Sequence, residues 1–224
     1  MIKRYLRKLE RKIARRLGLL IRNMDEELDR LSLPAFANKP ANLHFSTPRR
    51  ISNPTCIWIG DDVSLGPGCL LSATRKYPGK FMQGSPDVKV QEFEPVIKIG
   101  NRVSATGYLT IGAVQSVEIC DDVLLASHIF VGDNQHGHSV VELPFKYQRL
   151  EKISPVKIGA GCWIGEQVVI MPGVSIGKMS IVGANSVVTE SVPPRSIVVG
   201  SPARIVRHWD SDAAAWRKPV PDDE

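Results

Sequence analysis

The stretch IGAGCWIGEQVVIMPGVSIGKMSIVGANSVVTES, residues 158–191, repeats with a period of six residues. Each unit opens on an aliphatic residue, and its fifth residue is small or β-branched. The opening residues are Ile158, Ile164, Ile170, Ile176, Val182 and Val188, and the fifth residues are Cys162, Val168, Val174, Ser180, Ser186 and Val192. An α-helix repeats at about 3.6 residues and a strand at about 2, so neither accounts for this period. The pattern indicates a short strand and a turn in every unit.

Three such units close a triangular coil, in which the aliphatic residue points inward and the fifth residue fills the remaining interior space. Stacked coils form a parallel β-helix with one continuous core. The same grid recurs earlier in the chain, at Ile59 and Leu65, at Ile99, Ala105 and Ile111, and at Ile119, Leu125 and Val131. A β-sandwich of irregular short strands does not hold phase over six consecutive units. The sequence therefore predicts an all-β parallel β-helix, and the spacing leaves its handedness open.

Two segments interrupt the period, residues 72–95 and 133–155, and both are rich in Lys, Pro, Gly and acidic residues. We interpret them as extended loops ejected from the coil stack, because long loops of repeat folds commonly carry function. The predicted organisation is a basic amphipathic α-helix over residues 1–34, a β-helix domain over 35–207 and a C-terminal tail over 208–224.

The N-terminal arm combines an apolar stripe with many basic residues. Its apolar positions, spaced by three or four, are Ile2, Leu6, Leu9, Ile13, Leu17, Leu20, Met24, Leu28 and Leu31. This eleven-residue repeat has about 3.67 residues per turn, which keeps the stripe on one side of a helix that Pro34 ends. Two interpretations stay open. Either the stripe packs on the β-helix or on symmetry-related copies, or residues 1–24 lie on the anionic inner face of a membrane.

The charge of the chain is unevenly distributed. Residues 1–24 hold nine Lys and Arg against Glu10, a net +8, and the +6 of the whole chain leaves −2 over residues 25–224. A near-neutral body argues against a nucleic-acid-binding protein. No apolar run approaches the ~18 residues of a membrane span, and no secretory signal pattern follows the basic start. The four widely spaced cysteines favour reduced thiols over disulfides or a zinc site. These features predict a cytoplasmic protein without bound nucleic acid or metal.

Two segments, EICDDVLLASHIFVGDNQHG (residues 118–137) and CWIGEQVVIMPGVSIGKMSIVGANSVVTESVPPRSIVVGSPARIVR (residues 162–207), closely resemble the hexapeptide-repeat acyltransferases. Within that family they are similar to the sugar O-acetyltransferases, such as the maltose and galactoside acetyltransferases and enzymes that acetylate surface polysaccharides. The resemblance implies a left-handed β-helix and a homotrimer with active sites between subunits. It also implies acetyl-CoA as donor and, as acceptor, a hydroxyl of a sugar in a surface polysaccharide or lipid-linked glycan.

The family's catalytic histidine ends a short polar segment and precedes Gly or Pro, a pattern that His136 and Gly137 match. Histidine suits the task because imidazole titrates near neutrality and can take the proton of a sugar hydroxyl that attacks a thioester. The orientation of the ring requires an acceptor at its other nitrogen, for which Asp133 or a backbone carbonyl is expected. His138 is interpreted as a solvated neighbour or an acceptor-site residue, and His128 as a coil-turn or subunit-interface residue.

The resemblance also assigns residues to the donor site. By motif match, the acetyl-CoA contacts fall on Gly165, Ala184, Thr189, Arg204 and Arg207, with Trp163 at the family's tryptophan position. Two positions depart from the family pattern, because Glu166 stands where Ser is common and Glu190 where Lys is common. A cation beside the CoA phosphates is thereby lost, and Lys178 and Arg195 are the candidates to compensate for it.

The acceptor site is weakly specified. Thr106 and Val114 stand where the galactoside enzymes carry polar sugar contacts, which disfavours simple galactosides. The loop of residues 72–95 is expected to shape the acceptor pocket with Arg75, Lys76, Tyr77 and Phe81.

Three other functions compete with this interpretation. An antibiotic O-acetyltransferase would use a similar loop histidine on another hydroxyl. A γ-carbonic anhydrase shares the β-helix but needs three histidines across an interface, a spacing that this sequence does not show. A non-catalytic trimeric scaffold is disfavoured because His136, Arg204 and Arg207 are all retained.

Overall fold

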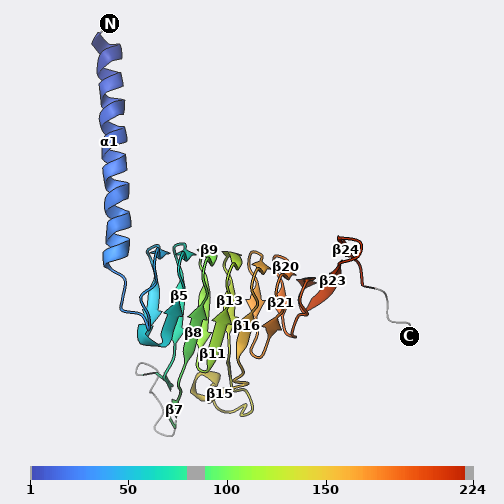
Figure 1. Ribbon diagram of the computed structural model, residues 1–224. Helices are drawn as coiled ribbons and strands as arrows, with labels where there is room; N and C mark the ends of the chain where they lie inside the picture. The colour runs from blue at the N-terminus through green and yellow to red at the C-terminus, as the bar shows by residue number, and fades with distance from the viewer. Residues whose placement is uncertain (1, 80–88, 220–224) are drawn as a thin grey trace.

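The computed structural model describes residues 2–79 and 89–219, in which a long helix precedes a stack of β-coils (Figure 1). Helix α1 spans Ile2–Leu31 and ends before Pro34, as predicted. Met1 and residues 220–224, at the ends of the predicted arm and tail, lie outside the described residues, and so does Phe81.

Three sheets run the length of the stack. The first contains β1 (His44–Phe45), β4 (Ser64–Leu65), β9 (Ser104–Gly107), β12 (Leu124–Ser127), β17 (Trp163–Ile164), β20 (Ile181–Val182), β22 (Ser196–Gly200), β23 (Ala203–Asp210) and β24 (Ala215–Arg217). The second contains β2 (Arg50–Ser52), β5 (Leu70–Ala73), β10 (Thr110–Ala113), β13 (Phe130–Gly132), β18 (Val169–Ile170) and β21 (Val187–Val188). The third contains β3 (Ile57–Ile59), β8 (Val96–Ile99), β11 (Ser116–Ile119), β16 (Val156–Ile158) and β19 (Ser175–Ile176).

Strands that follow one another in the coils belong to different sheets, and up to β22 all pairings within the three sheets are parallel. Each full coil therefore adds one strand to each sheet, which is the architecture of a parallel β-helix. The fold predicted from the period of six is confirmed. The left-handed sense of winding stays a prediction from the family resemblance.

The predicted inward positions form the core. All fourteen aliphatic residues that the sequence places at the start of a six-residue unit are buried, each at most 6% exposed. The six fifth-position residues from Cys162 to Val192 are buried as well. The parallel register places the opening residue of one unit beside the opening residue of the unit in the next coil. In the third sheet, for example, Ile99 pairs with Ile59 on one side and with Ile119 on the other. Burial of each such side chain contributes about 1.5–3 kcal/mol. The core is thus a column that grows with every coil.

Helix α1 projects from the N-terminal end of the stack, and Arg49 fixes its base there (Figure 1). The guanidinium of Arg49 donates to the carbonyl oxygen of Asp29 at 2.8 Å and to Ser32 Oγ at 2.7 Å. Farther out, every side chain from Glu10 to Asp25 is exposed. For the part of the stripe whose side chains are described, from Ile13 to Leu31, the prediction that it packs on the β-helix of its own chain is therefore wrong. Packing on a second copy stays a prediction.

Both predicted loops leave the stack at the edge between the second and third sheets. In the first loop β6 (Lys76–Tyr77) pairs antiparallel with β7 (Gln91–Glu92), and in the second β14 (Gln135–His136) pairs antiparallel with β15 (Leu150–Glu151). Short 3₁₀ turns are η1 (Pro54–Cys56) and η2 (Phe145–Tyr147), the latter in the second loop. The two hairpins lie below the stack in Figure 1. The first loop begins later than predicted, because Ser72 and Ala73 belong to β5.

An antiparallel ribbon closes the C-terminal end of the stack, where β23 pairs with β22 and β24. In β24, Trp216 packs edge-on against Trp209 of β23 at a ring-centroid distance of 5.4 Å. The predicted boundary after Arg207 falls inside β23. The division into three segments otherwise stays a prediction.

Candidate active site

Asp133 anchors the base of the second loop. It is fully buried, and its carboxylate accepts the N–H groups of Val114 at 2.9 Å and of Gln115 and Ser116 at 2.7 Å. These amides form the tight turn between β10 and β11, in the coil that separates the two loops. The side chain of Asn134 donates a further hydrogen bond at 2.9 Å. Both carboxylate oxygens are engaged by the turn, and the ring of His136 is not among the hydrogen-bond partners of Asp133. The role of Asp133 or of a backbone carbonyl in orienting that ring stays a prediction.

His136 has a different partner, Tyr77 of the first hairpin. The Tyr77 hydroxyl lies 3.0 Å from Nδ1 of His136, and it donates to the carbonyl oxygen of Lys146 at 2.6 Å. The two rings meet edge-on, with centroids 5.3 Å apart. Burial raises the pKa of the Tyr77 phenol above its ordinary value, so the hydroxyl stays protonated at neutral pH.

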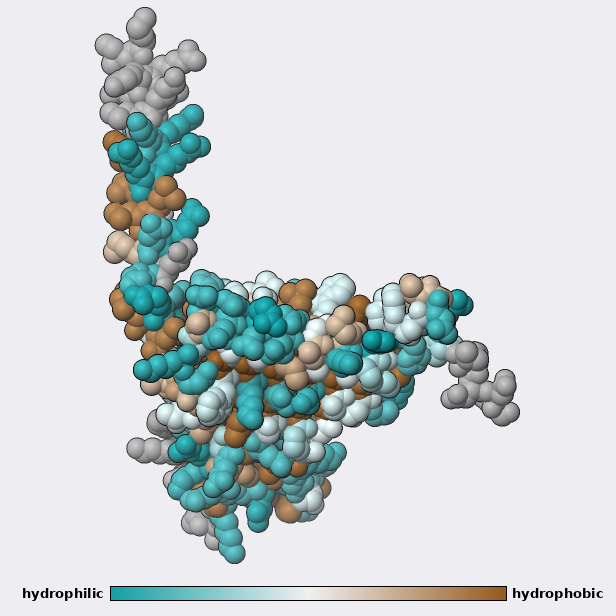
Figure 2. Space-filling view, viewed as in Figure 1, coloured by the Kyte–Doolittle hydropathy of each residue, from teal (hydrophilic) through white to brown (hydrophobic). Residues whose placement is uncertain are grey.

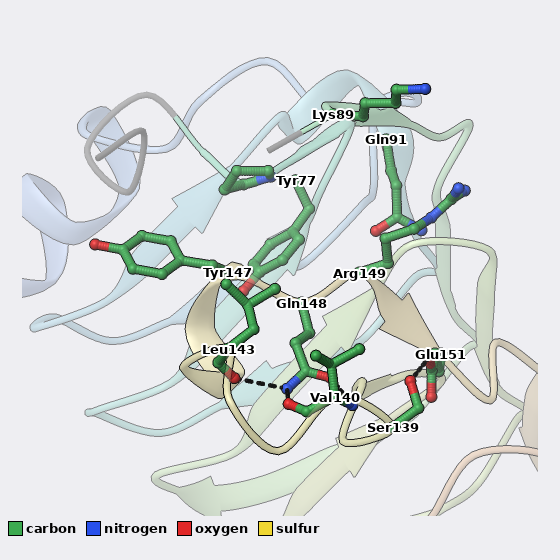
Figure 3. Close-up of a pocket in the computed structure, with 11 residues that line it drawn as sticks. Tyr77, Lys89, Gln91, Ser139, Val140, Leu143, Tyr147, Gln148, Arg149 and Glu151 are labelled. Atoms are coloured by element: carbon green, nitrogen blue, oxygen red, sulfur yellow. Dashed lines mark hydrogen bonds between the residues drawn. The ribbon is translucent and has the colours of Figure 1, made fainter. Parts of the chain in front are cut away.

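Two cavities lie at this contact, one lined by both residues and the other by Tyr77 without His136. One, of 210 Å³, is lined by the hairpins and by the second sheet, with His136, Tyr77, Thr74, Phe130 and Asn134 among its walls. The other, of 340 Å³, lies between the two hairpins, as Figure 3 shows. Tyr77 lines both cavities. The exposed His136 side chain therefore stands beside a hollow large enough to admit part of a sugar ring.

The neighbours of His136 are explained by local geometry. A Cβ at Gly137 would lie 2.7 Å from the carbonyl oxygen of Arg149, so the close approach of the two hairpin strands requires glycine after the histidine. His138 is exposed and is not among the residues that line the 210 Å³ cavity. His128 occupies a coil turn at a φ of 59° and stacks on Tyr108 of the preceding coil at 4.6 Å. Its predicted coil-turn position is confirmed.

The predicted donor residues lie on another part of the surface. Trp163, Ile181, Ile197 and Arg207 are register neighbours across four strands of the first sheet. Ile164, Val182 and Val198, which directly follow the first three of these residues in their strands, are buried. Because successive side chains of a strand point to opposite faces, this row faces outward, and Trp163 is 51% exposed. Adjacent strands are about 4.8 Å apart. The row is an apolar strip that ends in a guanidinium group, a surface that fits an elongated ligand with a phosphate at one end.

The other donor positions lie at the coil corners and the terminal hairpin. A Cβ at Gly165 would be 2.7 Å from the backbone nitrogen of Ala184, so the stacking of the coils itself requires this glycine. Thr189 is exposed directly after β21. The guanidinium of Arg204 lies 3.6 Å from the carboxylate of Glu190, and both side chains are more than half exposed. Such an exposed pair is weak, so Arg204 stays accessible to an anion.

The residues that depart from the family pattern have structural partners. Glu166 accepts the N–H of Ser127 in the neighbouring coil at 3.1 Å. Arg195 donates to Ser211 Oγ at 3.4 Å, and its role as a replacement cation, like that of Lys178, stays a prediction.

The structure does not bring the two groups of predicted residues together within one chain. None of the six donor positions lines the 210 Å³ cavity beside His136. The Tyr77 contact was missed at the level of sequence, where Tyr77 was placed only in a loop that shapes the acceptor pocket. Its partner is 59 residues away, and no local pattern joins the two. Within the described residues, no group of three or more His, Cys, Asp or Glu side chains is placed to hold a metal ion.

Comparisons with known proteins point in one direction. Residues 155–190 match the family described as bacterial transferase hexapeptide (six repeats). The Escherichia coli protein WbbJ, named as an O-acetyl transferase of lipopolysaccharide biosynthesis, is 36% identical over 55% of this chain and 66% of its own length. A Mycobacterium tuberculosis protein named as an acetyltransferase is 31% identical over 74% of this chain and 57% of its own length. This chain thus spans about two thirds of one relative and little more than half of the other.

A solved structure extends the likeness over most of the chain. It is a variant of AntD, an N-acyltransferase from Bacillus cereus, in complex with dTDP-4-amino-4,6-dideoxyglucose and coenzyme A. It has 25% sequence identity and a TM-score of 0.63 over 84% of this chain and 90% of AntD. With the hexad core, these similarities confirm the prediction from the sequence: the chain belongs to the hexapeptide-repeat acyltransferase family.

Proposed function

We propose that this protein is an acetyl-CoA-dependent O-acetyltransferase that acts on a hydroxyl of a sugar, in a surface polysaccharide or a lipid-linked glycan. The observation that carries the proposal is the placement of His136, held by a hydrogen bond on a short hairpin beside a 210 Å³ cavity. The similarity to WbbJ, whose name includes O-acetyl transfer in lipopolysaccharide biosynthesis, supports a glycan hydroxyl as acceptor.

In this proposal His136 acts as general base. Its imidazole takes the proton of the acceptor hydroxyl while that oxygen attacks the thioester carbonyl. When the carbon–sulfur bond breaks, the imidazolium returns the proton to the departing thiolate, so the products are an acetyl ester and free CoA thiol. A backbone N–H of a neighbouring coil is the proposed donor to the oxyanion.

The residues of the first sheet fit the donor. The outward row that begins at Trp163 and ends at Arg207 offers an apolar strip for the pantetheine arm and a cation for a phosphate. Arg204, also exposed, adds a second cation. The row lies on the first sheet, whereas His136 lies on a loop that leaves the stack between the second and third sheets. We therefore propose a homotrimer in which the row of one subunit faces the His136 cavity of its neighbour.

A thiol-release assay tests the proposed reaction. Acetyl-CoA is offered with a panel of lipid-linked and free glycans, nucleotide-linked amino sugars and hydroxyl-bearing antibiotics. We expect release with a glycan hydroxyl, and a product that hydroxylamine cleaves because it is an ester. Thiol release only with an antibiotic would make the antibiotic hydroxyl, not a glycan hydroxyl, the acceptor. If no acceptor causes thiol release and CoA does not bind, the protein is a non-catalytic scaffold.

A second candidate is N-acylation of a nucleotide-linked amino sugar. The similarity to AntD favours it, because that likeness covers more of this chain than the alignment with WbbJ does. An amide product that resists hydroxylamine would support this candidate over the first.

Helix α1 suggests where the enzyme meets a lipid-linked acceptor. In Figure 2, hydrophobic residues gather along one side of its described part and hydrophilic residues along the other. Ile13, Leu17, Leu20 and Met24 share one face at about 3.6 residues per turn, and each is at least half exposed. The basic side chains Arg11, Lys12, Arg15, Arg16 and Arg22 lie outside this face.

An anionic membrane surface is the partner that this helix fits best. Residues 11–24 contain five basic residues and no acidic one, so bundling three copies of this segment would gather like charges without partners. On anionic lipid the same charges are attracted, each contributing about 1 kcal/mol, while the apolar face enters the interface. No helix in the described part of the chain is long and apolar enough to cross a membrane. From the basic side chains and the exposed apolar face of α1, we propose peripheral attachment to the cytoplasmic face of the membrane.

Vesicle sedimentation combined with light scattering checks both the membrane and the trimer proposals. The full chain is expected to bind phosphatidylserine or cardiolipin vesicles, to ignore neutral ones and to be released by salt. Deleting residues 1–24 should abolish binding and leave a trimer. Leu17→Gln combined with Leu20→Gln should weaken binding, whereas Leu19→Gln should not, because Leu19 is equally exposed but lies on the opposite face.

Three results would contradict these proposals. A full chain that does not bind anionic vesicles would refute membrane attachment. Loss of the trimer on deletion of residues 1–24 would make α1 an assembly element, and a stable, active monomer would refute the trimer.

A further inference from the structure

The two loops of the candidate site form one unit through a closed ring of four contacts. Tyr77 pairs with Gln91 in the first hairpin, and His136 pairs with Leu150 in the second. The Gln91 side chain joins the hairpins by accepting the N–H of Leu150 at 2.7 Å and donating to its carbonyl oxygen at 3.1 Å. The Tyr77–His136 contact closes the ring. Figure 3 shows Tyr77 and Gln91 on neighbouring strands of the first hairpin.

The direction of the Tyr77–His136 hydrogen bond follows from counting protons. A phenol has one proton, and Tyr77 donates it to the carbonyl oxygen of Lys146 at 2.6 Å, because a carbonyl can only accept. The phenol oxygen can then only accept from Nδ1 of His136, 3.0 Å away. Nδ1 must therefore carry a proton, and in the neutral ring Nε2 carries the lone pair.

We infer that Tyr77 is a positioning residue that holds His136 in the Nδ1–H tautomer and so leaves Nε2 as the basic nitrogen. The inference rests on the proposed function for its catalytic meaning. Tyr77 is suited to this role because it is only 7% exposed and its packing against Val114 and Leu150 fixes its ring. It fills the place for which Asp133 was predicted, with a neutral acceptor instead of a carboxylate.

The first test reads the tautomer without turnover. Nitrogen-15 NMR of the imidazole, assigned by its loss in His136→Gln, should show a protonated Nδ1 and a bare Nε2 above the titration range of the ring. Tyr77→Phe should give a mixture of tautomers, because the acceptor is gone while the ring stays. Tyr147→Phe is the matched control, since Tyr147 lines the cavity between the hairpins but its hydroxyl points away from Tyr77 (Figure 3).

The second test reads catalysis. Tyr77→Phe is expected to lower kcat about tenfold, the effect of one hydrogen bond, with the KM for acetyl-CoA and the melting temperature as in Tyr147→Phe. In an enzyme that already carries His136→Ala, Tyr77→Phe should cause no further loss, because Tyr77 acts through His136.

The outcomes separate this inference from the proposed function. A wild-type ring protonated on Nε2, or a Tyr77→Phe variant with unchanged tautomer and kcat, overturns the inference. An additive loss in the His136→Ala background overturns it too. Full activity of His136→Ala overturns the proposed base instead, and the NMR experiment then still decides whether the Tyr77 contact sets the tautomer.

Discussion

Replacing His136 with alanine is expected to lower turnover by about 10²–10⁴-fold, the usual cost of losing a general base. A sugar hydroxyl is a poor nucleophile, and the variant lacks the imidazole that is proposed to take its proton. The side chain is exposed, so its loss leaves no cavity in the core. The measurement is the rate of thiol release at saturating acetyl-CoA and acceptor, with donor affinity determined separately by calorimetry.

The matched control is His138→Ala, a second exposed histidine of the same loop that does not line the cavity beside His136. It should retain most of the activity. If His136→Ala turns over at the wild-type rate, the base is another group. If both variants lose donor affinity equally, the loop itself has been disturbed.

Replacing Asp133 with alanine is expected to destabilise the fold by about 3 kcal/mol or more. The change removes the buried carboxylate that accepts the backbone N–H groups of Val114, Gln115 and Ser116, and each N–H group left without a partner costs about 1–3 kcal/mol. For a chain of this length that corresponds to a melting temperature lower by about 6–12 °C. Activity should fall as well, since the turn of Val114 and Gln115 lies between the two loops that position Tyr77 and His136. Thermal unfolding followed by circular dichroism measures the effect.

Two variants give this experiment its controls. Asp133→Asn keeps one acceptor oxygen and should be less destabilised. Asp121→Ala removes an exposed carboxylate that accepts one backbone N–H, that of Asn101 at 2.8 Å; the Asp121 side chain is 44% exposed, so water can replace it. A small loss of stability is expected there. If Asp133→Asn instead unfolds at the wild-type temperature with a large fall in kcat, Asp133 acts on the chemistry and its structural role is secondary.

The features that depend only on residues close together in the sequence could be predicted well. Every aliphatic residue on the hexad grid is buried, from Ile59 to Val188, because a period of six is a property of neighbouring residues and needs no knowledge of distant ones. His136 could be singled out for a similar reason, since its motif lies within one continuous segment. The start of the first loop was missed by two residues, because Ser72 and Ala73 extend β5 beside β10 although they no longer follow the aliphatic grid.

The sequence by itself thus determined the coil architecture, the basic amphipathic helix and the position of the candidate base. Only the tertiary structure decided which groups meet. Asp133 accepts hydrogen bonds from a turn 17 to 19 residues away, and Tyr77 reaches His136 across 59 residues, through two hairpins that leave the same edge of the stack. The described part of the apolar face of α1 is likewise left uncovered, because the helix projects from the N-terminal end of the stack, beyond the first coil. A repeat encodes its own local geometry, whereas contacts between ejected loops depend on how whole coils stack, a sum over many residues that no short pattern contains.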